Sequence, residues 1–184
     1  LSAVDQSAPY YRKDGYWNGT VWMSHQWFFW KTMLDLNQAD FAWKIANTGL
    51  EVWRKEVETS YHCMEHFIIE TGRGAGWHEF GGLSTPVLSW FHAYYVPGHL
   101  TTGLNVWVTQ QQWNADNSAL SATFRLYGTD RAQQCTVVAC LHPQHTYRVA
   151  WNGKPVHADS PLPGVLEITL PYKTAEGNLC IAAI

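Results

Sequence analysis

The residues best suited to acid–base chemistry lie in one stretch of the chain, SYHCMEHFIIETGRGAGWHEFGG, at positions 60–82. Glycoside hydrolysis uses two carboxyl groups, one as acid and one as base or nucleophile. Glu65, Glu70 and Glu79 are therefore candidates for this chemistry. Glu65 stands between Met64 and His66, so apolar neighbours would raise the pKa of its carboxyl group and a charged histidine would lower it.

The same stretch allows a second kind of chemistry, metal binding. His62, Cys63 and His66 could ligate zinc, because histidines four residues apart share a helix face. His78 or Glu79 would then be the fourth ligand. The sequence has no CxxC pair and no HExxH pattern, so we expect no metal.

The composition argues against several classes of function. The net charge is −3 with 12 Lys and Arg and no basic run, which argues against nucleic acid as a partner. No apolar run reaches the roughly 18 residues of a membrane helix, so we expect no membrane partner. The GRGAG sequence lacks the Lys and Ser/Thr of a phosphate loop and indicates a flexible turn. We expect no cofactor.

The four cysteines are too few for a disulfide scaffold. A bridge between Cys140 and Cys180 is compatible with the sequence, and the question of its existence stays open, as does the cellular compartment.

Helical patterns fill the first half of the chain. They predict helices at residues 20–36, about 38–59 and about 86–96, the last with Thr85 as N-cap and Pro86 as its first residue. The first of these helices has apolar residues on nearly every side, which is typical of a helix buried all round. The C-terminal half of the chain, another subunit or further polypeptide must therefore cover it.

Alternating patterns fill the second half. They predict strands at residues 120–126, 133–141, 165–170 and 179–183, and a hairpin at 147–156 that turns at Asn152-Gly153. The spacing favours a small antiparallel β-sandwich over residues 99–184, after a helical domain over 1–98. The predicted fold is thus α+β in two parts. The second part shows no catalytic pattern, and we expect it to support the first part or at most to contact sugar through Trp107 and Trp113.

The GYWNGTVW sequence at positions 15–22 precedes the first predicted helix. It suits a helix start, and it also suits a sugar platform in which Trp17 stacks on a ring and Asn18 bonds hydroxyls.

Several short motifs occur together in an order that is familiar from one enzyme group. They are Tyr16, Trp17, Gly19 and Trp22, then Glu65, then Thr71-Gly72 and Ser89-Trp90. On these residues the chain resembles the C-terminal third of the catalytic domain of trehalase-like clan glycoside hydrolases, above all family 63. Asn18 and Thr20 depart from the Arg and Pro that are usual in the first motif.

The resemblance implies an (α/α)6 toroid and hydrolysis with inversion at the anomeric carbon. Glu65 matches the general base, which activates water. The general acid of the group is an Asp upstream of the matched region. Glu79 is a reserve candidate for the acid if the chain is self-sufficient.

The resemblance also implies a carbohydrate substrate, an α-glycoside such as an α-glucoside. The sugar-facing wall is expected to consist of four tryptophans, namely Trp17, Trp22, Trp77 and Trp90. Three histidines are expected to bond sugar hydroxyls or to tune the pKa of Glu65, namely His25, His66 and His78.

We therefore expect a C-terminal fragment, or one chain of a split protein, from an inverting glycosidase. The rest of the toroid would be its partner, in the same chain or another, and the isolated chain would not hydrolyse glycosides. The alternative is a non-catalytic carbohydrate-binding or structural module in which helical hairpins cap a β-sandwich.

Overall fold

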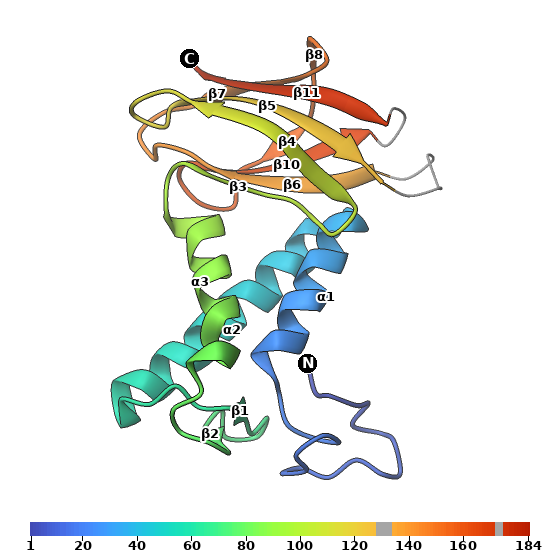
Figure 1. Cartoon of the computed structure of the whole chain (residues 1–184), viewed down its shortest axis with the longest axis vertical. Helices are drawn as coiled ribbons and strands as arrows, with labels where there is room; N and C mark the ends of the chain where they lie inside the picture. The colour runs from blue at the N-terminus through green and yellow to red at the C-terminus, as the bar shows by residue number, and fades with distance from the viewer. Residues whose placement is uncertain (128–133, 172–174) are drawn as a thin grey trace. The chain divides into compact units, whose positions relative to one another are not determined.

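A computed structural model describes residues 1–127, 134–171 and 175–184. The described part is α+β, as the sequence predicts, with helices followed by antiparallel sheets (Figure 1). It forms two compact units. The helical unit comprises Leu1–Trp30 and Trp43–Trp90, and the sheet unit comprises Lys31–Ala42 and Phe91–Ile184. The predicted division at residue 98, the (α/α)6 toroid and the β-sandwich stay predictions.

The helices are α1 (Met23–Asp35), α2 (Ala39–Ser60) and α3 (Gly81–Tyr95). α1 starts three residues later than predicted because the backbone of Val21 pairs with that of Phe67. The N–H of Val21 donates to the carbonyl of Phe67 over 2.8 Å, and the N–H of Phe67 donates back over 2.9 Å. A residue that pairs in this way is extended and cannot belong to the first helical turn.

α3 starts five residues earlier than predicted, so Pro86 lies inside it. The N–H of Leu83 already donates to the carbonyl of Phe80 over 3.0 Å, which places the first turn before Thr85. Proline lacks only its own N–H, so near a helix start it removes a single backbone hydrogen bond. The proline signal identified the helix correctly and its first residue wrongly.

The core of the helical unit joins all three helices through Trp90. This ring packs edge-on against Trp30, with centroids 6.5 Å apart, and lies over Gly49, where a Cβ would stand 2.5 Å from it. α1 is not covered all round, because Phe28 and Phe29 are exposed. The described residues thus leave part of α1 uncovered, and its cover by another subunit or by further polypeptide stays a prediction.

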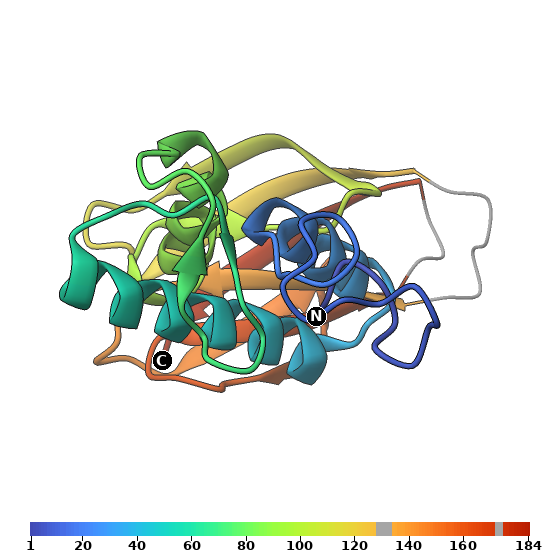
Figure 2. The same cartoon turned by 90° about the horizontal axis from the view of Figure 1, so that it is seen from below.

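The connection between α2 and α3 folds back along α2 (Figure 2). It contains two short strands, β1 (His66–Phe67) and β2 (Gly74–Ala75), which pair antiparallel.

The sheet unit contains two antiparallel sheets. The first has the order β3-β6-β10-β9, with bounds His99–Thr101, Gln134–Cys140, Val165–Pro171 and Ala158–Asp159. The second has the order β4-β5-β11-β7-β8, with bounds Val106–Trp113, Ala119–Leu126, Glu176–Ala183, Tyr147–Trp151 and Lys154–Pro155. Alternate residues of both sheets meet in one hydrophobic core.

Most predicted strands are confirmed within a few residues, but the expected start of one at position 133 lies outside the described residues. The hairpin turn is confirmed, since Asn152 and Gly153 have φ values of 49° and 75°, as a two-residue turn requires. β4 was not predicted, because a bulge between Val108 and Gln110 breaks its alternation. Cys140 and Cys180 lie in different sheets, and both are free thiols.

The segment between α1 and α2 belongs to the sheet unit. Asp35 accepts hydrogen bonds from the N–H groups of Leu104 and Asn105. Asn37 accepts from the hydroxyls of Thr136 and Thr169, on β6 and β10. Asn37 therefore lies against β6 and β10 on the side away from the hydrophobic core, where Thr136 is buried. None of the described helices is long and apolar enough to cross a membrane.

Candidate active site

A tight turn before α1 positions the first aromatic residues of the site. The side-chain amide of Asn18 donates to the carbonyl of Tyr10 over 2.6 Å, and the backbone carbonyl of Asn18 accepts from the N–H of Arg12. A Cβ on Gly19 would stand 1.6 Å from the Arg12 carbonyl, so only glycine fits there. The side-chain amide of Asn18 thus stabilises the turn. The sequence instead suggested that it bonds sugar hydroxyls.

The turn presents two stacked indoles. Trp17 lies parallel to Trp22, with ring centroids 4.2 Å apart, and the Nε1–H of Trp22 donates to the carbonyl of Tyr16. Trp22 is buried, whereas Trp17 is 60% exposed. His25 lies beside both indoles, about 6 Å from each. Trp17 therefore offers a free ring face, and Trp22 supports it from below.

Glu65 lies next to this cluster and is held by two donors. The hydroxyl of Tyr16 donates a short hydrogen bond to Oε1. The N–H of Trp77 donates to Oε2 over 3.0 Å, and the Glu65 N–H donates to the Trp77 carbonyl over 2.9 Å. The Tyr16 bond, and after it the Trp77 bond, lower the pKa of Glu65 against the opposing effect of desolvation. The carboxylate is therefore ionised near neutral pH and can accept a proton.

Gly76 makes this position of Glu65 possible. Its φ is 76°, a conformation that favours glycine. A Cβ there would stand 2.6 Å from Oε2 of Glu65 and 2.7 Å from Cε1 of His66. A side chain at this residue would displace the carboxylate.

His66 lies under the cluster, 5.1 Å from the rings of both Tyr16 and Trp22. It is buried, and burial lowers its pKa although Glu65 acts in the opposite direction. Its Nδ1 is buried without a hydrogen-bond partner among the described residues. The imidazole thus packs against Tyr16, the residue whose hydroxyl donates to Glu65.

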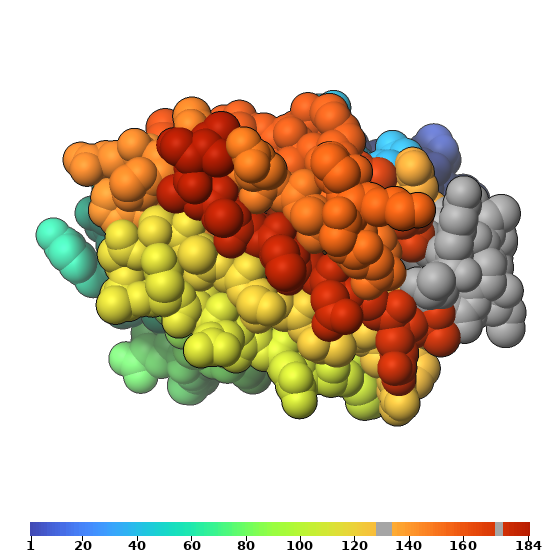
Figure 3. Space-filling model, turned by 90° about the horizontal axis from the view of Figure 1, so that it is seen from above, coloured from blue at the N-terminus to red at the C-terminus, as the bar shows by residue number. Residues whose placement is uncertain are grey.

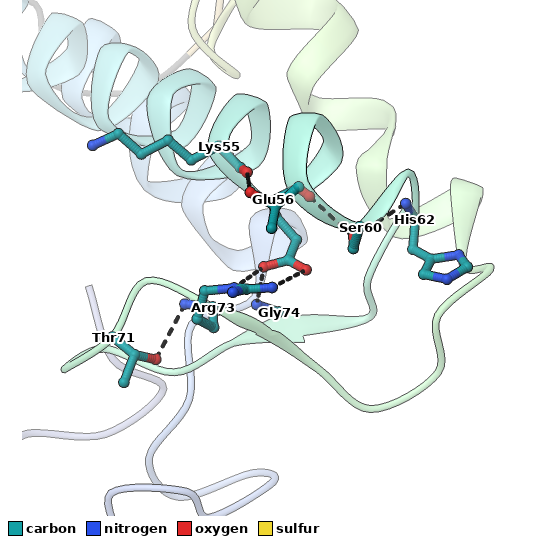
Figure 4. Close-up of polar contacts among 8 residues, drawn as sticks. Lys55, Glu56, Ser60, His62, Thr71, Arg73 and Gly74 are labelled. Atoms are coloured by element: carbon teal, nitrogen blue, oxygen red, sulfur yellow. Dashed lines mark hydrogen bonds and ion pairs between the residues drawn. The ribbon is translucent and has the colours of Figure 1, made fainter.

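Sequence reasoning missed Glu56, which anchors the loop that carries Glu65. Its side chain is 3% exposed and accepts from Nε of Arg73 over 2.7 Å, from Nη2 over 3.2 Å and from the Gly74 N–H over 2.9 Å (Figure 4). The Arg73 bonds are the largest cause of a pKa of about 2 for Glu56. A signal existed, because Glu56 continues the apolar face of α2 formed by Val52 and Trp53, where a carboxylate needs a partner.

The GRGAG sequence is consequently not a free turn in this structure. Arg73 and Gly74 both bind Glu56 on α2, and the N–H of Arg73 also donates to the hydroxyl of Thr71. The hydroxyl of Ser60 bonds the backbone carbonyl of Glu56 and receives the N–H of His62 (Figure 4). This chain of contacts runs from the end of α2 to the segment that contains Glu65.

The other expected site residues divide into exposed and buried ones. Trp77 is 60% exposed and stacks on His78, which in turn lies 4.9 Å from His62. Glu79 is exposed and pairs with Cys63 through the backbone. Trp90 is fully buried in the helical core, so its ring has no face to offer a sugar. Within the described ranges no three His, Cys, Asp or Glu side chains gather to hold a metal.

The arrangement suits proton transfer beside a flat, partly apolar ligand. An ionised carboxylate stands in contact with Tyr16 and Trp77, and the exposed ring of Trp17 belongs to the same cluster. Such a carboxylate can take a proton from water, while exposed indoles can stack on sugar rings.

Comparison with known proteins gives a match for the N-terminal part of the chain. No curated protein matches it. Residues 1–81 match the family model of the mannosylglycerate hydrolase MGH1-like glycoside hydrolase domain. This range contains Tyr16, Trp17, Glu65 and Trp77, and the N-terminal part of the chain is thus similar to a glycoside hydrolase domain.

Proposed function

We propose that the helical unit carries part of the active site of an inverting glycoside hydrolase that acts on an α-glycoside. The observation that carries the proposal is the pair of hydrogen bonds that Glu65 accepts from Tyr16 and from the Trp77 N–H, inside the range that matches a glycoside hydrolase domain. Glu65 acts as the general base. It takes a proton from the water that attacks the anomeric carbon.

The environment of Glu65 supports a base more than an acid. A general acid must hold a proton at working pH, which requires a raised pKa. The two hydrogen bonds act in the other direction and stabilise the charged form of Glu65. The acid is therefore a different carboxyl group, about 6.5–9.5 Å away in an inverting enzyme to leave room for the water.

We propose that the acid and the rest of the sugar site belong to the remainder of an (α/α)6 toroid, in the same polypeptide or another. Exposed apolar residues of the helical unit support this, namely Phe28 and Phe29 on α1 and Leu88 on α3. Neighbouring helices of a toroid would cover them. Trp17 and Trp77 would stack on the sugar, and Trp22 would act by supporting Trp17.

Glycosyl fluorides test the base separately from the acid, because fluoride leaves without being protonated. We expect the chain to hydrolyse α-glucosyl or α-mannosyl fluoride slowly and to leave ordinary alkyl α-glycosides intact. Glu65→Gln should abolish the fluoride reaction, and Glu79→Gln, which alters an exposed carboxylate of the same loop, should not.

Proton NMR of the first product decides the stereochemistry. Inversion of an α-fluoride gives the β-anomer before mutarotation. Hydrolysis that survives Glu65→Gln, or an α-anomer as the first product, would overturn the proposal. Turnover of an alkyl α-glycoside by this chain alone, if lost in Glu65→Gln, would refute the placement of the acid on other polypeptide.

A further inference from the structure

The outer face of the five-stranded sheet presents an aromatic pair that the proposed hydrolysis does not use. Trp107 on β4 is 59% exposed. Its ring centroid lies 4.8 Å from that of Tyr127, at an interplanar angle of 53°. Figure 3 shows this face of the sheet, with β4 and β5 in yellow and β11 in red.

The register of the sheet explains why Trp107 faces outward and Trp113 does not. Trp107 lies opposite Arg125, which is exposed on β5, whereas Trp113 lies opposite the core residue Leu120. Trp113 accordingly packs against the hydrophobic core with its Nε1 buried. Of the two candidate sugar contacts in the second half of the chain, only Trp107 offers a ring face to a ligand.

Polar side chains surround the aromatic pair. The bulge between Val108 and Gln110 places Gln110 opposite Thr123, whose hydroxyl donates to Oδ1 of Asn178 over 2.9 Å. Gln112 lies opposite Ser121, one row farther along. The amides of Gln110 and Gln112 make no hydrogen bond to another described residue. Rows two residues apart in a strand are about 7 Å apart, so these amides lie within reach of a ligand that extends from Trp107.

The charge of this surface limits the kind of ligand. Arg125 and Glu176 are the charged groups that lie across the strands from Trp107, and they form an ion pair of 2.9 Å with each other. Around Trp107 the charged groups of the described residues thus neutralise each other, which does not suit nucleic acid or another polyanion. Two rings within a polar surround are also a smaller apolar patch than a protein partner usually covers.

We propose that the outer face of β4 and β5 binds a neutral carbohydrate chain. Trp107 and Tyr127 stack on one sugar ring, and Gln110 bonds hydroxyls of the next. A sugar ring has an apolar C–H face and a polar rim, which matches an exposed indole next to exposed amides. This binding does not depend on Glu65, so the sheet unit would hold a carbohydrate independently of its hydrolysis.

Isothermal titration of the whole chain with maltoheptaose and with a linear mannoheptaose tests the proposal. We expect at least one of them to bind with a Kd of about 1 mM or below. Trp107→Ala should weaken binding about tenfold or more, a loss of about 1.4 kcal/mol, because it removes the indole face on which the sugar ring stacks. Arg148→Ala is the matched control, since Arg148 is exposed on β7 of the same sheet and should not change the affinity.

Two further measurements separate this surface from the helical unit and from other occupants. Trp17→Ala should leave this binding intact, and the affinity should be the same at low and high salt. The proposal is overturned if neither heptasaccharide binds, or if Trp17→Ala abolishes the binding and Trp107→Ala does not. It is equally overturned if Trp107→Ala changes the oligomeric state in sedimentation and leaves sugar binding unaltered.

Discussion

The buried carboxylate of Glu56 should determine how firmly the loop that carries Glu65 is held. Glu56→Gln keeps the size of the side chain and removes its charge. An ionised acceptor contributes about 1.5–3 kcal/mol per hydrogen bond when buried. Glu56 accepts three such bonds, but Arg73 is about half exposed, so solvent screens much of the interaction. The amide also keeps one acceptor, and we expect a loss of about 2 kcal/mol in the free energy of unfolding.

Glu58→Gln is the matched control on the same helix. Glu58 pairs with Arg54 over 2.7 Å, but both side chains are exposed. Such a pair contributes about 0.5 kcal/mol or less. Urea denaturation at neutral pH, followed by circular dichroism, measures both variants. Equal losses for the two would refute the reasoning, because they would show that burial of Glu56 does not matter.

The difference in unfolding free energy between the wild-type chain and Glu56→Gln should also depend on pH, which gives an independent check. The pKa of Glu56 lies near 2 in the folded chain, below its ordinary value of 4.5. The unfolded chain therefore binds the proton first as the pH falls, and stability is lost with it. The contribution of Glu56 is complete above about pH 4.5 and disappears as the pH falls toward 2. The difference in the free energy of unfolding between the wild-type chain and Glu56→Gln should decrease as the pH falls through this window. A difference that does not change with pH would contradict the ion pair.

Two further predictions concern the carboxylate itself. Tyr16→Phe removes the hydroxyl that donates to Glu65, so the pKa of Glu65 should rise, as carboxyl-carbon NMR would show; an unchanged titration would mean that the bond is absent in solution. Gly76→Ala should destabilise the chain and abolish the hydrolysis of glycosyl fluorides, because its Cβ meets Oε2 of Glu65. Gly72→Ala has a similar φ of 66° with open space around it, so it should cost only the backbone strain of about 1 kcal/mol and leave Glu65 in place. Equal effects of the two alanines on hydrolysis would contradict the contact with Glu65.

The order of helices and strands could be predicted from the sequence because it depends on local patterns. The turn at Asn152-Gly153 and the alternation of β5 are properties of neighbouring residues. The ends of the helices depend on distant partners. Val21 is drawn out of α1 by Phe67, which lies 46 residues later in the chain, and no local signal at Val21 indicates this.

The site divides in the same way. Residue types and motif order led to Glu65 and to the exposed indole of Trp17. The sequence left the pKa of Glu65 open between apolar and charged neighbours, and the structure shows that two hydrogen-bond donors decide it. One of them is a backbone N–H, which any residue at position 77 could supply and which no sequence pattern reveals.

The position of the Glu65 carboxylate therefore depends on how the loop around it is held. The loop between α2 and α3 has three glycines, and unrestrained glycines would make a carboxylate mobile. Glu56 removes this freedom by binding Arg73 and Gly74, two residues before Gly76. Trp77, whose N–H binds Glu65, comes directly after Gly76 in the chain. The ion pair between Glu56 and Arg73 therefore fixes the position of Glu65 through the backbone, although Glu56 and Glu65 make no hydrogen bond with each other. Loss of Glu56 should thus lower the rate of fluoride hydrolysis in a folded chain, whereas loss of Glu58 should not.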